Sequence, residues 1–339
     1  MSARRPTIHT VAQRAGVSAT TVSFVLNDAP HARVSPATRE RVVAAAAELG
    51  YRPNSVAKSL RTARSRSIGF ITDHIAASQY AGDVIRGAHD RAWSAGEMLL
   101  VVNSEGRADV EAAAVEMLLD RQVDGIIYAT RGFRGVQPVD SLRRVPTVLA
   151  NCYDAEGALP SIGPDDRGGG ATATEALIDG GHRRIAFISG RPAGPVAPAA
   201  DERLAGYRAA LDAAGLDFDP DLVRHSNWRP SGGYAETKAL MALAEPPTGI
   251  FCVTDTVAIG AYEALKELGL GIPDDVAVVG YDNIELAAEL TPPLTTVALP
   301  HMEMGRWAVE RLAARCRGAD PDGGDHTTLT CPLIARAST

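Results

Sequence analysis

The sequence lacks any apolar run of the roughly 18 residues that a membrane-spanning helix needs. Its opening residues, MSARRPTIHT, also lack the apolar middle of a secretion signal. These two absences predict a cytoplasmic protein with no membrane partner.

Cysteine is scarce and dispersed. The four Cys residues are Cys152, Cys252, Cys316 and Cys331. A disulfide framework or a zinc site would need close pairs such as C-x2-C, and the eight His residues also lack the spacing of metal ligands. Because Cys152 and Cys252 lie in apolar segments (VLANCY and GIFCVT), we expect free structural thiols, no metal and no cofactor.

Motifs of catalysis are missing as well. Ser189, in FISGRP, lacks the Gly-x-Ser-x-Gly frame of a nucleophile elbow. The glycine-rich segment GPDDRGGGA (163–171) lacks the Lys of a phosphate loop and follows no apolar strand closely, so we interpret it as a crossover into the second half of the chain. We therefore predict no catalytic residues and no enzyme activity. A cytoplasmic enzyme on an α/β scaffold is the alternative, and turnover of a bound sugar would favour it.

Charge is divided unevenly along the chain, whose formal net charge is −7. Residues 1–66 hold eleven Lys or Arg against three Asp or Glu, a net charge of +8, whereas the rest of the chain carries −15. A basic N-terminal segment on an acidic body indicates that only this segment meets a polyanion. On charge alone, a merely solvated basic arm is the alternative.

Residues 7–27, TIHTVAQRAGVSATTVSFVLN, predict two short helices joined by a tight turn. Apolar residues recur at helical spacing from Ile8 to Ala15, Gly16 interrupts them, and Ser18 can cap a second helix. The residues expected to pack the angle between the helices are Ala15, Val17 and Val22. Those expected to face outward are Ala19, Thr20, Ser23, Phe24 and Asn27. Such small and hydroxylic side chains suit close contact with base edges and phosphates.

A third helix should follow, with Ser35 as its cap and Pro36 in its first turn. Its apolar face is expected to hold Val42, Val43, Ala46 and Leu49. Together the three helices predict a small all-α domain.

The next segment, residues 49–71, reads LGYRPNSVAKSLRTARSRSIGFI. Pro53 stops the preceding element and Asn54 can cap a single helix of about two turns, which is marginal alone in water and should order only against a partner. Leu60 is apolar and has no evident core to enter, which favours a wedge between base pairs in the minor groove. A plain flexible linker is the alternative.

Beyond residue 67 the sequence alternates short apolar runs with helical stretches. The apolar runs are 68–73, 98–103, 125–130, 147–151, 184–189, 222–227, 249–254 and 276–281. The helical stretches are 82–95, 107–121, 201–215, 232–244 and 256–268. This βαβ pattern, repeated in two halves, predicts two doubly wound parallel sheets, whose ligands bind beyond the carboxyl ends of the strands. Two facing halves would form a cleft.

Polar side chains at the ends of these runs are the candidate ligand-binding residues. They are Asp73, Asn151, Asn227 and Asp255, with Arg203 at the start of a helix and Trp228 after Asn227. Carboxylates accept hydrogen bonds from hydroxyls, Arg donates several, and an indole ring offers an apolar face to a sugar. The combination suits a monosaccharide, a small oligosaccharide or a nucleoside-like molecule. The alternatives are a capping carboxylate for Asp255, a surface position for Arg203 and core packing for Trp228.

Several longer motifs occur in a fixed order. They are VAQRAGVSATTVSFVLN, RVSPATRERVVAAAAELGYRPNSVAKSLRT, GHRRIAFISG, ERLAGYRAAL, VTDTVAIGA, VVGYDN and PPLTTVALP. With these motifs the chain resembles the LacI/GalR family of bacterial transcription regulators over nearly its whole length. The resemblance implies a homodimer whose recognition helices enter successive major grooves of a pseudo-palindromic operator in double-stranded DNA. It also implies that hinge helices, Asn54–Arg61, enter the minor groove. The sequence departs from the family at Phe24, where many members carry Arg. Phe cannot make the bidentate guanine contact of Arg but can press on a thymine methyl group.

The resemblance also distributes residues between two sites. The residues predicted to contact DNA are Thr7, Ser18, Ala19, Thr20, Thr21, Ser23, Phe24, Asn27, Arg33, Asn54, Ala57, Lys58, Leu60 and Arg61. At the effector the resemblance implies Arg203, Asp255, Trp228 and Asn151, with an aromatic side chain near Tyr80. Asp73 and Asn227 join this set from their places at strand ends.

The predicted fold is an N-terminal all-α helix-turn-helix domain with a hinge helix, followed by an α/β body like that of periplasmic binding proteins. We predict a DNA-binding domain over 1–52, a hinge helix and linker over 53–66, and an effector-binding and dimerisation domain over 67–339. The last divides into an N-subdomain, about 67–165 and 299–327, and a C-subdomain, about 166–298 and 328–339. Dimerisation is expected through helices near Tyr80 and within 249–268, and the lack of a long heptad tail after Arg315 favours a dimer over a tetramer.

The predicted function is that of a transcriptional repressor controlled by a small-molecule effector, a carbohydrate, in the cleft between the subdomains. A regulator that responds to a nucleoside or purine-like ligand is one alternative. A solute-binding protein without a DNA function is another alternative, although such proteins need an export signal and this chain has a basic N-terminal segment in its place.

Overall fold

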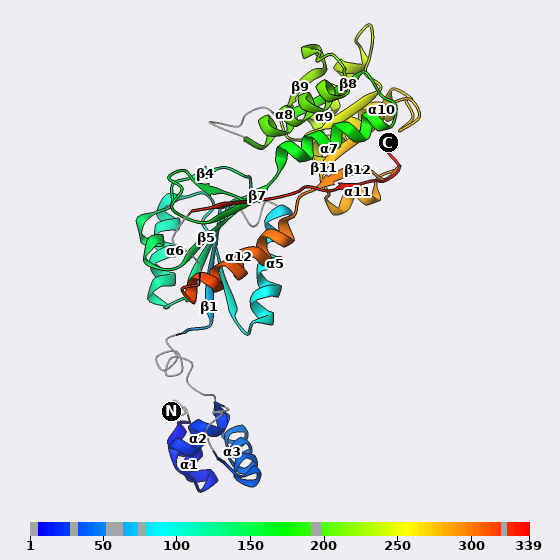
Figure 1. The fold of residues 1–339 in the computed structure, drawn as a ribbon. Coiled ribbons are helices and arrows are strands. Elements are labelled where there is room, and N and C mark those ends of the chain that lie inside the picture. Colours follow the sequence, from blue (N-terminus) through cyan, green and yellow to red (C-terminus); the bar gives the residue numbers. More distant parts are fainter. Residues whose placement is uncertain (1–5, 28–32, 52–63, 74–78, 191–197, 320–323) are drawn as a thin grey trace. The chain divides into compact units, whose positions relative to one another are not determined.

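The computed structural model of the chain describes residues 6–27, 33–51, 64–73, 79–190, 198–319 and 324–339. The chain divides into two compact units, Met1–Ser65 and Arg66–Thr339. We call the first unit the head and the second the body (Figure 1).

The head contains three short helices, α1 (Ile8–Ala15), α2 (Ala19–Leu26) and α3 (Pro36–Glu48) (Figure 1). Each begins at a hydroxyl cap, because the side chains of Thr7, Ser18 and Ser35 accept a hydrogen bond from the backbone N–H three residues further on. Gly16 ends α1 with a φ of 67°, a left-handed conformation that glycine adopts without strain. The predicted helix-turn-helix and third helix are confirmed.

One valine from each helix forms the centre of the head. Val11, Val22 and Val42 are fully buried, and their contact fixes the angle between the three helices. The predicted packing of Ala15 and Val17 around them is confirmed.

Two details of the predicted head are wrong. Val43 is 51% exposed, because the inward face of α3 is formed by Val42, Ala45 and Ala46. Ala19 is partly buried against the head core, whereas we expected it to face outward. Val43 lies one step around the helix from the buried Val42, and Ala19 lies one turn before the buried Val22, at the border of the apolar face of α2.

The body contains two six-stranded sheets. The first sheet is entirely parallel, in the order β13-β7-β5-β3-β1-β2. Its strands are β1 (Ser67–Thr72), β2 (Met98–Asn103), β3 (Gly125–Ala129), β5 (Thr147–Ala150), β7 (Ser161–Pro164) and β13 (His326–Leu329). Helices α5 (Gln79–Ser94) and α12 (His301–Cys316) pack against each other and the sheet, and α6 (Ala108–Asp120) packs against β1. A two-stranded ribbon, β4 (Gly135–Val136) with β6 (Tyr153–Asp154), and a 3-10 helix, Asp140–Arg144, complete this half.

The second sheet has the order β14-β12-β11-β10-β8-β9, parallel except for the pairing of β12 with β14. Its strands are β8 (Ile185–Gly190), β9 (Val223–Ser226), β10 (Gly249–Cys252), β11 (Ala277–Asp282), β12 (Thr295–Ala298) and β14 (Leu333–Ile334). Its helices are α7 (Asp166–Asp179), α8 (Pro198–Ala213), α9 (Pro230–Met241), α10 (Asp255–Glu267) and the short α11 (Glu285–Glu289), with a 3-10 turn at Pro220–Leu222. Each of the eight predicted apolar runs forms a strand, and the predicted doubly wound sheets are confirmed.

The chain passes between the two halves three times. It runs from β7 in the first sheet to α7, which packs against β11 and β12 of the second sheet. It returns from β12 to α12, and crosses again from β13 to β14. Segment 163–171 is a crossover, as predicted. The expectation that it follows no apolar strand closely is wrong, because the buried strand β7 ends at Pro164.

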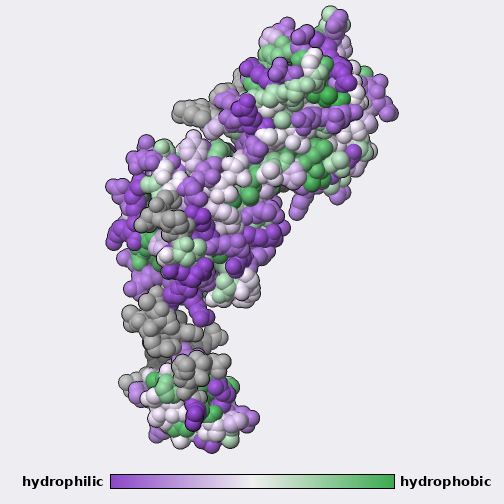
Figure 2. All heavy atoms as spheres, viewed as in Figure 1, coloured by the Kyte–Doolittle hydropathy of each residue, from purple (hydrophilic) through white to green (hydrophobic). Residues whose placement is uncertain are grey.

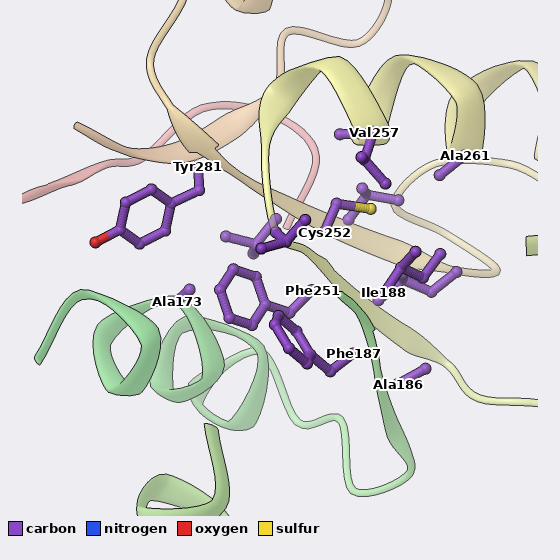
Figure 3. Packing of buried hydrophobic residues seen from close by; sticks show 14 of the residues in the cluster. Ala173, Ala186, Phe187, Ile188, Phe251, Cys252, Val257, Ala261 and Tyr281 are labelled. Atoms are coloured by element: carbon purple, nitrogen blue, oxygen red, sulfur yellow. The ribbon is translucent and has the colours of Figure 1, made fainter. Parts of the chain in front are cut away.

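Aromatic rings fill the centre of the second half. The rings of Phe187 and Phe251 lie 4.8 Å apart between their centroids, and Tyr207 and Tyr281 continue the cluster on either side. Figure 3 shows Phe187 and Phe251 side by side, with Ala173 of α7 close to them. Hydrophilic residues cover most of the face of the body seen in Figure 2. No helix among the described residues is long and apolar enough to span a membrane.

Reciprocal glycines bring three pairs of helices into backbone contact. A Cβ atom at Gly206 of α8 would lie 2.0 Å from the carbonyl oxygen of Arg167, and one at Gly170 of α7 would lie 2.3 Å from that of Arg203. The same arrangement joins α9 to α10 through Gly233 and Gly260, and α5 to α12 through Gly87 and Gly305. Helices that carried side chains at these points would have to move apart.

Gly206→Ala is expected to lower the free energy of unfolding of the body by about 2–3 kcal/mol, because the added methyl group overlaps the backbone of α7. The matched control is Gly82→Ala on α5, where a Cβ meets nothing within 4 Å. That change should be neutral or stabilise the body by up to about 1 kcal/mol. Denaturant unfolding of the three proteins measures both effects, and an equal response to the two substitutions would contradict the close contact of α7 and α8.

Candidate functional site

The outward face of α2 is polar but uncharged. Thr20 and Phe24 are exposed and lie one helical turn apart, with Ser23 and Asn27 half-buried beside them. The Asn27 amide nitrogen donates to the Ser23 carbonyl oxygen at 2.8 Å, so it is turned back onto its own helix. Val22 and Val25 hold the opposite face in the head core. This face can offer hydroxyl groups and one aromatic ring to a partner.

The other residues predicted to contact DNA fall into two groups. Thr7, Ser18 and Arg33 are exposed, and Thr21 is half-buried. The hydroxyl groups of Ser18 and Thr21 are hydrogen-bonded to each other at 2.9 Å. The predicted hinge helix lies outside the described residues, and with it Asn54, Ala57, Lys58, Leu60 and Arg61.

At the carboxyl edge of the first sheet, Asp73 and Asn151 are buried and held by the loops beside them. Asp73 accepts a hydrogen bond from the backbone N–H of Arg131 at 2.9 Å and pairs with the Arg134 guanidinium at 3.0 Å. Asn151 has a φ of 57°, and its amide nitrogen donates to the carbonyl oxygens of Thr130 and Arg131 at 2.9 and 3.1 Å. Tyr80 is the second residue of α5, and its side chain lies outside the described part of the chain.

A small cavity opens at this edge of the first sheet. It is lined by Phe70, Thr72, Val84, Ala129, Thr130, Arg131, Asn151 and His301. Of the predicted site residues the cavity includes Asn151. Its volume of about 10 Å³ has room for about one water molecule, which would meet the threonines, the asparagine and the imidazole.

Arg203 is buried in the second half, between two carboxylates. Its Nε and Nη2 both lie 2.8 Å from one carboxylate oxygen of Asp166, its Nη1 donates to the Val253 carbonyl oxygen at 2.7 Å, and Asp282 lies 3.6 Å away. The Tyr281 ring covers the guanidinium at 3.6 Å. Burial opposes the charge, but the neighbouring carboxylates outweigh it and raise the pKa of Arg203. The alternative of a surface position for this residue is therefore wrong.

Asp255 starts α10 at the carboxyl end of β10 and is fully buried. One carboxylate oxygen accepts from the Thr296 hydroxyl at 2.6 Å, and the other accepts from the backbone N–H of Ile284 at 2.9 Å. Thr254, one residue earlier, supplies the cap of the helix. Burial raises the pKa of Asp255 to about 7, because loss of solvation outweighs these two hydrogen bonds.

Asp255→Asn is expected to change how stability depends on pH. Between the ordinary pKa of 3.8 and about 7, the unfolded chain loses the proton that the folded carboxyl keeps, so Asp255 makes the body less stable as the pH rises through this window. Asn has no proton to lose, and the variant should therefore gain up to about 1 kcal/mol per pH unit relative to the parent across it. Unfolding measured from pH 4.5 to 8 checks this; parallel pH profiles for the two proteins would show that Asp255 ionises normally.

Trp228 and Asn227 follow β9 at the same edge of the second sheet. Trp228 is half-buried with a φ of 63°, and its indole covers Gly190, where a Cβ would lie 2.0 Å from the ring. Asn227 is exposed, accepts from the Arg229 backbone N–H at 3.1 Å and donates to the Ser231 hydroxyl at 3.3 Å. One face of the indole thus packs on the strand end.

The structure brings three further residues to these edges that the sequence analysis did not single out. Asp166 and Asp282 hold Arg203, and His301, the first residue of α12, lines the cavity of the first half. Burial and the charge of Arg203 together lower the pKa of His301 to about 4, which keeps the imidazole neutral. A neutral imidazole can donate one hydrogen bond and accept another. Its place directly after the run TTVALP was the available signal, since α12 starts where the chain returns from β12.

No disulfide joins any of the four cysteines, and Cys152, Cys252 and Cys331 are buried. Burial raises the pKa of the Cys152 thiol to about 12 and that of Cys331 to about 11, which makes both poor nucleophiles. Within the described ranges, no group of three or more His, Cys, Asp or Glu residues is placed to hold a metal ion.

Two family models match the chain. Residues 7–54 match the model of bacterial regulatory proteins of the lacI family, and residues 174–339 match the model of a periplasmic binding protein-like domain. The first match covers the helix-turn-helix and the second covers most of the second half of the body.

Curated relatives match the chain over nearly its whole length. It is 34% identical to the ribose operon repressor of Haemophilus influenzae over 311 residues, which is 92% of each protein. It is 32% identical to the transcriptional repressor CytR of Escherichia coli over 334 residues, 98% of this chain and 96% of that one. The transcriptional repressor PurR of Vibrio campbellii is 34% identical over 313 residues.

Solved structures share the whole fold. The lac repressor dimer bound to operator and the anti-inducer ONPF has a TM-score of 0.80 at 30% identity, with 99% of each chain covered. The complex of the transcriptional regulator CelR with cellobiose has a TM-score of 0.67 at 31% identity, with 99% of this chain and 100% of that one covered.

Proposed function

The chain belongs to the lacI family of bacterial regulatory proteins, and we propose that it is a transcriptional repressor. A small molecule controls its affinity for operator DNA. The observation that carries the proposal is the union, in one chain, of a capped helix-turn-helix with a body whose two parallel sheets end in buried polar side chains. We propose a cytoplasmic location, because the DNA that such a protein reads lies there.

DNA binding belongs to the head. The second helix of a helix-turn-helix enters the major groove, and α2 presents Thr20, Ser23 and Phe24 for this purpose. Thr7, Ser18 and Thr21 add hydroxyls near helix N-termini, where phosphate oxygens bind. The hinge residues Asn54–Arg61 would contribute from the minor groove, as the family resemblance implies.

The effector site belongs to the body. We propose that the effector lies at the carboxyl edges of the two sheets, between Asn151 and Asp73 on one side and Trp228, Asp255 and Arg203 on the other. Arg203 would act mainly through the buried charges that it balances, because its donors already serve Asp166 and Val253. The polar groups are hydrogen-bond donors and acceptors with an indole beside them, which suits an uncharged carbohydrate.

A nucleoside or purine-like effector is the second candidate. It is favoured by relatives named PurR and CytR, whereas the relative named for the ribose operon and the CelR complex with cellobiose favour a carbohydrate. A solute-binding role without DNA is not favoured, because the head is a complete helix-turn-helix. The same relatives are repressors, and we propose no catalytic activity.

We also propose that the chain acts as a homodimer. Strand β2 is an edge strand of the first sheet and exposes apolar side chains, Met98 at 58% and Val101 at 40%. Trp93, near the end of α5, is 69% exposed. Exposed apolar groups on a sheet edge are the kind of surface that a second copy covers.

The function is tested by two measurements on the full-length protein. Selection of genomic fragments should enrich a pseudo-palindromic sequence, and a thermal-shift screen of sugars and nucleosides should find a compound that stabilises the body. Recovery of no preferred fragment, with and without each hit, would exclude the proposed function. A stabilising sugar that the protein also converts to product would instead restore the enzyme alternative.

A further inference from the structure

The side chain of Phe24 is the most exposed large apolar group of the recognition helix α2. It is 44% exposed, on the face opposite the buried Val22 and Val25. The exposed part of the ring adds nothing to the fold of the head and is available for contact with a partner.

Helix α2, which carries Phe24, lacks the Arg, Lys and Gln side chains that usually read guanine and adenine. From Ala15 to Asn27 the sequence AGVSATTVSFVLN contains no Lys, Arg or Gln. Arg14, just before it, pairs with Glu48 of α3 at 2.8 Å. The amide of Asn27 donates to the carbonyl and hydroxyl oxygens of Ser23. Guanine is usually read by Arg or Lys, and adenine by Asn or Gln.

The major groove offers one apolar group to such a helix. Each base pair presents hydrogen-bonding edges there, and only thymine adds a methyl group, at C5. The bases are stacked, so a ring carried by a helix in the groove meets their edges and not their faces. A phenyl ring 44% exposed on this face matches the thymine methyl group better than it matches the polar base edges.

We infer that Phe24 is a specificity-determining residue that reads the C5-methyl group of a pyrimidine in each half of the operator. The inference rests on the proposed function, since it concerns the same DNA-binding face. It assigns thymine to the base that Phe24 meets. It also has a consequence for modified DNA: 5-methylcytosine carries the same methyl group at the same place, and cytosine and uracil lack it.

The test uses full-length protein and the duplex enriched from random DNA, selected with and without a small-molecule extract of the producing cells. Each thymine of the half-site is replaced in turn by uracil, which removes only the methyl group. Replacement at one position of a half-site should weaken binding about fourfold, which corresponds to the loss of one buried CH2-sized group. Replacement at the symmetric positions of both half-sites should weaken binding about 15-fold. At a position changed to cytosine, methylation at C5 should restore part of the binding.

Two variants connect this loss to Phe24. In Phe24→Ala the thymine and uracil duplexes should bind equally at that position. The matched control is Val43→Ala, which removes an apolar side chain of similar exposure from α3 of the same head and should leave the uracil effect intact. Both side chains are exposed, and thermal unfolding of the two variants confirms that the head is still folded.

The outcomes separate the two proposals. The proposed contact of Phe24 with the methyl group is wrong if a sequence is enriched but no uracil replacement weakens binding, or if the uracil effect persists in Phe24→Ala. In both cases the proposed function as a DNA-binding regulator still stands. If no sequence is enriched under either condition, the proposed function fails and this inference fails with it.

Discussion

Replacing Arg203 by Met is expected to lower the free energy of unfolding of the body by about 3–5 kcal/mol. The guanidinium is the cation between Asp166 and Asp282, at 2.8 and 3.6 Å, in a site where all three groups are buried. Met keeps the length of the side chain but leaves two carboxylates close together without a counter-charge. Either the carboxylates take up protons or water enters the site, and both cost stability.

The control for this prediction lies on the same helix. Arg208 of α8 is exposed, and its guanidinium lies 4.3 Å from the centre of the Phe218 ring. Arg208→Met should cost less than about 1 kcal/mol. Adding Asp166→Asn to Arg203→Met should recover part of the loss, because it removes one of the unpaired charges. Chemical denaturation of the four proteins measures these differences, and equal losses at positions 203 and 208 would refute the buried charge cluster.

Removing residues 1–65 is expected to abolish sequence-specific DNA binding, with a loss of at least roughly 1,000-fold in affinity for the selected operator. The thermal unfolding of the body and its response to a stabilising ligand should stay the same, because the head core is built from head residues alone. Fluorescence anisotropy of labelled duplexes and a thermal-shift assay on the same preparations make the comparison.

A substitution in the head provides the matching control. Val22→Asp places a charge at a fully buried position of the head core and should unfold the head within the full-length chain. It should give the same loss of DNA binding as the truncation. Loss of ligand binding in either protein would contradict the division of work between head and body.

Most of the fold was predictable from local pattern. The hydroxyl caps at Ser18 and Ser35 and the glycine at position 16 define the head helices, and the first β-strand was found because IGFIT is a short apolar run before a polar residue. The errors at Val43 and Ala19 arose because helical spacing alone does not distinguish neighbouring positions at the border of an apolar face. Tertiary contact with the other helices decides there.

The strands that were missed have little apolar pattern. Strand β7, SIGP, and strand β13, HTTL, contain Gly, Pro or hydroxylic residues, and they are strands because the sheet pairs them. The two-residue β14 pairs with β12 near the end of the chain. Such segments take their structure from neighbours that are distant in the sequence.

The sequence predicts candidate site residues, and it does not predict their contacts. Arg203 and Asp255 were chosen as polar residues near strand ends, and each proves to be buried among protein partners. The partner of Arg203, Asp166, lies 37 residues earlier in the chain, and that of Asp255, Thr296, lies 41 residues later. No local pattern reports such pairs, because they exist only once α7, α8 and β12 have packed around the second sheet.

We propose that a small molecule bound by the body controls the affinity of the head for DNA. The full-length protein is titrated onto its enriched duplex at modest ionic strength, with and without each compound that stabilises the body. At least one such compound is expected to change the affinity by about fivefold or more, while random duplex is bound equally in both conditions. Identical affinities with and without every stabilising compound would contradict it.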